Sequence, residues 1–331
     1  MTTRVEPQAE IGLLLYPECQ LAAVYGLTDL FRVAGEWAAR AAEGDHAPSI
    51  RTSHWQACEE EQTVRLVWDS QPGPPHRLNH VIAPPSLVLP EQMRPMPASA
   101  AWMAAQHTAG STLCSICAGA FVLAETGLLD GRRATTHWAF ARQLAARFPA
   151  VELAEDHMVL DDGDIITAGG ILAWTDLGLT LVERFLGPSI MLATARFLLV
   201  DPPRKQQRPF AQFIPRFDHG DEAVRRVQHA MHAQPQQVHS IAELAARAML
   251  GERTLLRRFQ KATGLRPTAY LQQVRVAKAR ETLELTNRPV DQIAWQVGYQ
   301  DPAAFRKVFR KTTGLGPQQY RKRFGVEKPE R

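Results

Sequence analysis

In the first two hundred residues, short apolar runs alternate with longer stretches in which apolar residues recur every three or four positions. The apolar runs lie at 11–16, 81–83, 112–116 and 165–167, and the helical patterns at 22–42, 118–125 and 177–185. Such runs are typical of strands, and the periodic stretches of helices. Their alternation predicts an α/β domain with a flavodoxin-like parallel sheet sandwiched by helices. Its ligands are expected beyond the carboxyl ends of the strands.

The last ninety residues follow a different pattern, because one segment occurs twice. The matching pairs are 259–270 with 309–320 and, one residue closer together, 241–248 with 290–297. In each copy two large apolar residues repeat at four-residue spacing, Leu255 with Phe259 and Phe305 with Phe309. Each copy therefore predicts a short helix, a turn and a second helix that ends at a glycine. The sequence indicates an all-α domain with a tandem helix-turn-helix.

The charge of the chain is unevenly divided. Residues 220–331 contain 21 Lys and Arg against 10 Asp and Glu, a net charge of +11, whereas residues 1–219 contain 17 against 24, a net charge of −7. This asymmetry predicts a polyanionic partner for the C-terminal part. Short helices interrupted by glycine lack the long amphipathic face of an interfacial anchor, so nucleic acid is favoured over a membrane surface.

At these residues the chain resembles the AraC/XylS class of bacterial transcription regulators. The resemblance covers roughly 221–325 and rests on the repeat spacing and on the Gly-Leu-x-Pro-x-x-Tyr ending of both copies. It implies double-stranded DNA as a partner, with the two second helices in successive major-groove segments about 34 Å apart. It also implies a long helix that joins the two copies, over about 268–286, with Leu271, Val274, Leu283 and Leu285 as its buried positions. The DNA-binding positions that we assign on this basis are Arg253, Leu256, Arg257 and Arg258 in the first copy, and Pro302, Ala303, Arg306, Lys307 and Arg310 in the second.

The two second helices differ in what they offer to DNA. Arginine is the usual bidentate reader of guanine, so the first helix is expected to carry more of the hydrogen-bonded base recognition. The second begins with Asp301 as an N-cap and Pro302 as the first helical residue, and Pro302 and Ala303 offer only apolar contacts. It is expected to rely on phosphate contacts and DNA shape.

Composition and apolar run lengths fit two domains of a cytoplasmic protein. No apolar run is long enough to span a bilayer, the N-terminus lacks a signal-peptide pattern, and the four cysteines show no disulfide-framework spacing. The proline-rich stretch 201–209 separates the halves. We expect a ligand-sensing domain over 1–201, a linker over 202–219, a DNA-binding domain over 220–325 and a tail over 326–331.

A cysteine flanked by small residues follows the predicted strand at 112–116. Cys117, with Ala118 and Gly119 behind it, has the sequence of a nucleophile elbow, in which a sharp turn exposes the side chain at a helix start. Here the chain resembles the class I glutamine-amidotransferase-like superfamily, which includes the Pfp-type proteases. It is most similar to the sensor domains fused to AraC regulators in the GlxA family. The matching segments are 115–119, 127–131, 134–138 and 162–169.

The catalytic complement of this superfamily is incomplete in the chain. His137 matches a histidine found near the cysteine in some members, but no Asp or Glu lies between Cys19 and Thr28, where enzymes place an acid. Pro84 and Pro85 stand where enzymes have glycines whose N–H groups bind an oxyanion. Proline has no N–H, and loss of one such donor alone slows a reaction about 100- to 1000-fold. We therefore predict no enzymatic activity.

Other chemistry at these residues is less favoured. Cys114 and Cys117 have the spacing of a metal or redox pair, but no second Cys/His pair accompanies them, so neither a metal nor a cofactor is predicted. Packing is favoured over an aromatic ligand cage for Trp102, Trp138 and Trp174.

The resemblances imply a one-component transcription regulator, an activator that responds to a small nitrogenous metabolite. They also imply a homodimer formed through the N-terminal domain and contact with RNA polymerase, without membrane association. The expected ligand-binding residues are Pro85, Cys117, Ala118 and His137. Two alternatives remain open: a cysteine-dependent hydrolase or hydratase fused to a DNA-binding domain, and a regulator that senses redox state through Cys117.

Overall fold

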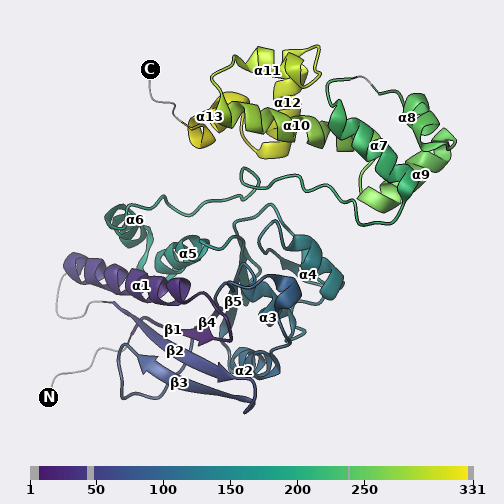
Figure 1. The fold of residues 1–331 in the computed structure, drawn as a ribbon. Helices are drawn as coiled ribbons and strands as arrows, with labels where there is room; N and C mark the ends of the chain where they lie inside the picture. The colour runs from purple at the N-terminus through teal and green to yellow at the C-terminus, as the bar shows by residue number, and fades with distance from the viewer. Residues whose placement is uncertain (1–6, 43–47, 238, 327–331) are drawn as a thin grey trace. The chain divides into compact units, whose positions relative to one another are not determined.

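A computed structural model describes residues 7–42, 48–237 and 239–326. The chain divides into two compact units between Gln207 and Arg208, inside the stretch 202–219 that the sequence indicated as a linker. Residues 327–331 of the expected tail lie outside the described residues. Each unit has its own core and is treated separately below (Figure 1).

The N-terminal unit is built on a seven-stranded sheet in the order β3-β2-β1-β4-β5-β9-β8. Its strands are β1 (Ala9–Leu15), β2 (Ile50–Cys58), β3 (Thr63–Asp69), β4 (His80–Ala83), β5 (Thr112–Ile116), β8 (Val159–Asp161) and β9 (Ile165–Ala168). The five central strands run parallel, while β3 and β8 pair antiparallel at the two edges. The predicted α/β class is confirmed, with a sheet that is parallel except at its edges.

Helices cover both faces of this sheet. They are α1 (Leu21–Ala41), α2 (Pro97–Thr108), α3 (Gly119–Ala124), α4 (Ala141–Arg147), α5 (Trp174–Leu186) and α6 (Pro188–Phe197), with a 3-10 turn, η1 (Pro90–Gln92), and a short pair, β6 (Arg133–Ala134) and β7 (Glu152–Leu153). The group α1, α5 and α6 packs together on one face, and α2 and α3 lie on the other (Figure 1). Because both faces are covered, the central strands are almost entirely buried, which explains their continuous apolar runs.

The C-terminal unit is all-helical, as predicted. Its helices are α7 (Glu222–Ala233), α8 (Ile241–Ala248), α9 (Glu252–Thr263), α10 (Pro267–Leu285), α11 (Val290–Gln296), α12 (Pro302–Thr313) and α13 (Pro317–Phe324). The first core joins α7, α8, α9 and the first half of α10, and the second joins the rest of α10 to α11, α12 and α13. The expected long helix is α10, but Leu285 is 53% exposed rather than buried, because it ends the helix beyond the second core.

Candidate nucleic-acid interface and elbow site

The second helix of the first repeat, α9, has one buried face and one exposed face. Leu255 and Phe259 are fully buried, and the exposed side of the helix carries Arg253, Leu256 and Arg257. Helix α9 begins after Gly251, which provides no side-chain cap. Three of the residues assigned to DNA contact therefore share one exposed helix face.

Arg258 lies differently from its neighbours on α9. Its Nε donates to Oδ2 of Asp221 at 2.8 Å and its Nη2 to Oδ1 at 2.7 Å. Asp221 also caps α7, because its carboxylate accepts the Val224 N–H at 3.1 Å. The pKa of Asp221 is lowered, chiefly by the hydrogen bond from Arg258. This arrangement gives Arg258 a structural role, joining α9 to α7, that the sequence did not indicate.

The second repeat presents a different helix start. The Asp301 carboxylate accepts the N–H groups of Ala303 at 2.8 Å and Ala304 at 3.1 Å, so it caps α12 as its sequence predicted. Pro302 follows as the first helical residue and is partly exposed. Arg306 is exposed but forms an ion pair with Asp291 of α11. The other exposed positions on this helix are Ala303, Ala304, Lys307, Arg310 and Lys311.

The elbow expected after β5 is present in the backbone. Cys117 has a φ of 54°, in the left-handed region that residues with a side chain rarely adopt. Its N–H donates to the Ala168 carbonyl at 2.7 Å, and its own carbonyl accepts the Thr136 hydroxyl at 2.7 Å. A Cβ on Gly119 would lie 2.4 Å from the Ala83 carbonyl oxygen, so only glycine fits there. These contacts hold the strained residue in place.

The elbow thiol is enclosed. Cys117 is 1% exposed, Ala118 is fully buried and Pro85 is buried, so these three expected ligand residues are together but covered. Burial raises the pKa of the Cys117 thiol to about 12. The thiol is therefore protonated at neutral pH, whereas a cysteine nucleophile reacts as the thiolate.

His137 does not complete a catalytic pair in this arrangement. Its Nδ1 accepts the Ala139 N–H at 3.1 Å, and its ring lies against Trp138 and Phe140 at 5.3 and 5.0 Å between centroids. No hydrogen bond joins it to Cys117 in the part of the chain that the structure describes. Burial lowers the pKa of its imidazole, which favours the neutral form. The ring is positioned by its own loop rather than by the cysteine.

The loops after β1 and β4 are joined next to the elbow. The Pro84 carbonyl accepts the Tyr16 hydroxyl at 2.6 Å, and the Pro85 carbonyl accepts the Gln20 N–H at 2.7 Å. In return the Leu87 N–H donates to the Glu18 carbonyl at 3.1 Å. The prolines thus contribute only acceptors, so neither supplies an oxyanion donor.

An open cavity of about 590 Å³ lies beside these joined loops. Its lining comes from 15–22, with Gln56 of β2 and Leu87. Strands β2 and β4 flank β1, so this is the point where the strand order reverses, the usual ligand position in such sheets. Gln20 is 9% exposed, and its buried amide oxygen has no hydrogen-bond partner among the described residues. The sequence carried no signal for Gln20, because its role depends on a loop 65 positions away.

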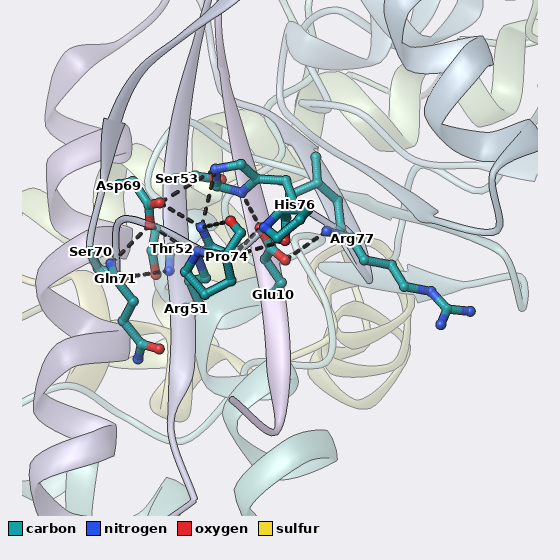
Figure 2. Close-up of polar contacts among 12 residues, drawn as sticks. Glu10, Arg51, Thr52, Ser53, Asp69, Ser70, Gln71, Pro74, His76 and Arg77 are labelled. Carbon is teal, nitrogen blue, oxygen red and sulfur yellow. Dashed lines mark hydrogen bonds and ion pairs between the residues drawn. The ribbon is translucent and has the colours of Figure 1, made fainter. Parts of the chain in front are cut away.

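The amino-terminal end of β1 and β2, at the opposite end of these strands from the cavity, holds a buried network of charges (Figure 2). Arg51 is 2% exposed and donates to both Asp69 oxygens, at 3.1 and 2.6 Å, and to the Pro74 carbonyl at 3.0 Å. Glu10 lies 3.5 Å from Arg51 and also pairs with His76. Because these charges pair with one another, we interpret the network as a structural link between β1, β2 and β3 rather than as a ligand site.

In the described ranges, no three His, Cys, Asp or Glu side chains gather closely enough to hold a metal ion. Nor is any described helix both long and apolar enough to cross a membrane.

Comparisons with known proteins agree with the two-unit division. The family model described as a helix-turn-helix domain matches residues 244–323, and that of the DJ-1/PfpI family matches residues 76–184. The HTH-type transcriptional regulator CdhR of Pseudomonas aeruginosa strain PAO1 is 30% identical over 68% of this chain and 67% of its own length. The regulator GlxA of Rhizobium meliloti strain 1021 is 30% identical over 65% and 67%. An isonitrile hydratase of Pseudomonas putida is 42% identical over 22% of this chain and 31% of its own.

Proposed function

Because this chain belongs to the AraC-type helix-turn-helix regulators that carry a DJ-1/PfpI domain, we propose that it binds specific sites on double-stranded DNA and activates transcription in response to a small metabolite. The observation that carries the proposal is the pair of helices α9 and α12. Each buries a large apolar pair and turns basic residues outward. The remaining partners we propose are RNA polymerase and a second copy, bound through the N-terminal unit, all within the cytoplasm.

We place the effector at the carboxyl end of the sheet, near Pro85, Cys117, Ala118 and His137. Because the elbow itself is covered, we place the effector in the adjoining cavity. From there it acts on the elbow loops through the hydrogen bond between the Gln20 N–H and the Pro85 carbonyl. The unpaired amide oxygen of Gln20 supports a ligand with an N–H or O–H donor, and a nitrogenous metabolite can supply the N–H.

The DNA-binding role of α9 is tested by two neighbouring arginines. Arg257→Ala removes an exposed side chain with no ion-pair partner among the described residues, and should weaken the specific duplex by about 1–3 kcal/mol while relaxing preference at one base pair. Arg258→Ala removes the contact with Asp221, so it should weaken specific and scrambled duplexes alike. Fluorescence anisotropy with both duplexes at one salt concentration provides the measurement.

Arg310→Ala is the control for charge. This exposed residue lies late in α12, where a phosphate contact is expected, so its loss should affect all duplexes equally. If Arg257→Ala also weakens both duplexes equally, Arg257 does not read sequence.

The similarity to an isonitrile hydratase makes an enzyme the second candidate, with Cys117 as the nucleophile. The buried thiol and the proline loop argue against it. We expect no turnover of isonitriles, amides or esters by the wild-type chain. Cys117→Ser should leave DNA affinity unchanged, while the buried hydroxyl costs the N-terminal unit about 1–3 kcal/mol of stability. Turnover that disappears in Cys117→Ser would establish the enzyme.

The redox alternative is tested by thiol labelling of the native chain. With a pKa of about 12, roughly one Cys117 thiol in ten thousand is ionised at pH 8, and burial blocks access as well. Iodoacetamide at pH 8 should therefore modify the partly exposed Cys58, the internal control, and leave Cys117 intact. Modification of Cys117 at the rate of Cys58 would favour a redox sensor.

A further inference from the structure

The last residue of the N-terminal unit is fixed by its side chain. Gln207 is 2% exposed, and its Nε2 donates to the carbonyls of Thr136 at 2.7 Å and His157 at 3.0 Å. Its Oε1 accepts the Trp138 N–H at 3.1 Å. A Cβ on Gly169 would lie 2.2 Å from Nε2, so the amide occupies a space that only glycine leaves open. Every polar group of this side chain is thus satisfied within the N-terminal unit.

The chain is held again as soon as the C-terminal unit begins. Arg280 of α10 is 7% exposed and donates to the carbonyls of Arg208 at 3.4 Å, Pro209 at 2.8 Å and Ala211. Phe210 packs against Phe324 with ring centroids 5.4 Å apart. Because Gln207 and Arg208 are consecutive, no free residue separates the two attachments.

The loop that holds Gln207 also holds the elbow. The Thr136 carbonyl accepts a hydrogen bond from Nε2 of Gln207. The Thr136 hydroxyl donates to the Cys117 carbonyl at 2.7 Å. His137 and Trp138 belong to the same loop. A shift of residues 135–138 therefore disturbs the elbow and the Gln207 attachment together.

We propose that Gln207 is the positioning residue through which the N-terminal unit restrains the DNA-binding unit. While Gln207 is docked, the connection has no slack; when residues 135–138 move, Gln207 leaves its site and the linker lengthens. The backbone here is also attached, because the Gln207 N–H donates to the Asp156 carbonyl at 3.0 Å and the Lys205 carbonyl accepts the Met158 N–H at 3.1 Å. Release breaks these bonds together with those of the Gln207 side chain. The next attachment upstream is Arg204, whose guanidinium pairs with the buried Asp176. Release frees three residues, about 10 Å of extended chain. This inference rests on the proposed function, because it explains how the sensor acts on DNA binding.

The added reach is what raises DNA affinity. A DNA-binding unit joined to a second one through a sensor dimer must place its helices at a fixed half-site spacing. A linker that is too short opposes that placement, unless the docked linker already holds the helices at the half-site spacing. A longer linker permits the placement. The docked state is therefore the one with lower affinity.

The test compares adjacent glutamines in the full-length chain. Gln207→Ala removes the side-chain bonds. Gln207→Glu replaces the amide nitrogen, which donates to the Thr135 hydroxyl and to the carbonyls of Thr136 and His157, by a carboxylate oxygen. Gln206→Ala is the matched control, because Gln206 is exposed. A fourth variant, Gly169→Ala, displaces the Gln207 amide from the other side.

Two readouts are combined. Trypsin cleavage after Lys205 should accelerate by about tenfold in both Gln207 variants and in Gly169→Ala, but not in Gln206→Ala. Affinity for the specific duplex should rise about 5- to 150-fold in the same variants, the usual range of coupling between sites. A merely structural role for Gln207 would change the melting of the N-terminal unit without raising DNA affinity.

The outcomes separate this inference from the proposed function. If the wild-type chain binds the specific duplex but Gln207→Ala has unchanged or lower affinity, the inference is overturned and the function stands. If the wild-type chain binds no duplex selectively, the proposed function itself fails, and the trypsin result alone then decides whether Gln207 anchors the linker.

Discussion

Raising the NaCl concentration from 50 to 200 mM should weaken DNA binding by this chain about 10³- to 10⁵-fold. That range applies to proteins that neutralise six to ten phosphates, because each neutralised phosphate releases condensed counterions. The C-terminal part, with 21 basic against 10 acidic residues, has enough positive charge for such a contact. Fluorescence anisotropy titrations at several salt concentrations give the slope directly.

Single substitutions calibrate this slope. Lys307→Ala removes an exposed cation from α12 and should reduce the slope by about one unit. Arg32→Ala removes an exposed cation from α1 of the N-terminal unit and should leave the slope unchanged. Binding that is insensitive to salt would exclude a phosphate contact of this size.

The sequence predicted those strands whose residues form continuous apolar runs. Strands β1, β4, β5 and β9 are buried on both faces and read as apolar runs. Strand β2 was missed because its buried positions include Arg51 and His54. Arg51 can be buried because Glu10 of β1 and Asp69 of β3 neutralise its charge. The residues next to Arg51 in sequence do not indicate these partners.

The tandem helix-turn-helix was predictable because it is repeated. Two copies with the same spacing identify each other, so the helices and the buried pairs such as Phe305 and Phe309 followed from the pattern. The pairing of Arg258 with Asp221 did not, since a basic residue reads the same in sequence whether it faces solvent or a carboxylate 37 positions away.

The N-terminal site shows the same limit. The turn at Cys117 was predictable, because small residues follow it and permit the elbow. The enclosure of its thiol was not, because it depends on loops distant in sequence. Gln207 lay in a polar, proline-rich stretch that the sequence indicated as a linker, yet its partners stand 50 to 71 positions away. Burial of a polar side chain is decided by such distant partners.

Selective binding is the second large effect expected. A chain that reads bases through Arg253 and Arg257 of α9, and DNA shape through α12, should prefer its own site over unrelated DNA by about 10³- to 10⁷-fold. Each base-pair change within the site should cost about 1–3 kcal/mol. The preferred sequence should extend over two successive major-groove segments, because the two helices belong to one unit.

The measurement that tests the central claim most directly is a competition between two duplexes. Rounds of selection from a random library on the full-length chain give the preferred sequence, and its affinity is then compared with that of a scrambled duplex of equal length and composition at one salt concentration. We predict a ratio of at least about 10³. Equal affinity for the two duplexes would contradict the account, because the basic surface would then bind DNA without reading it.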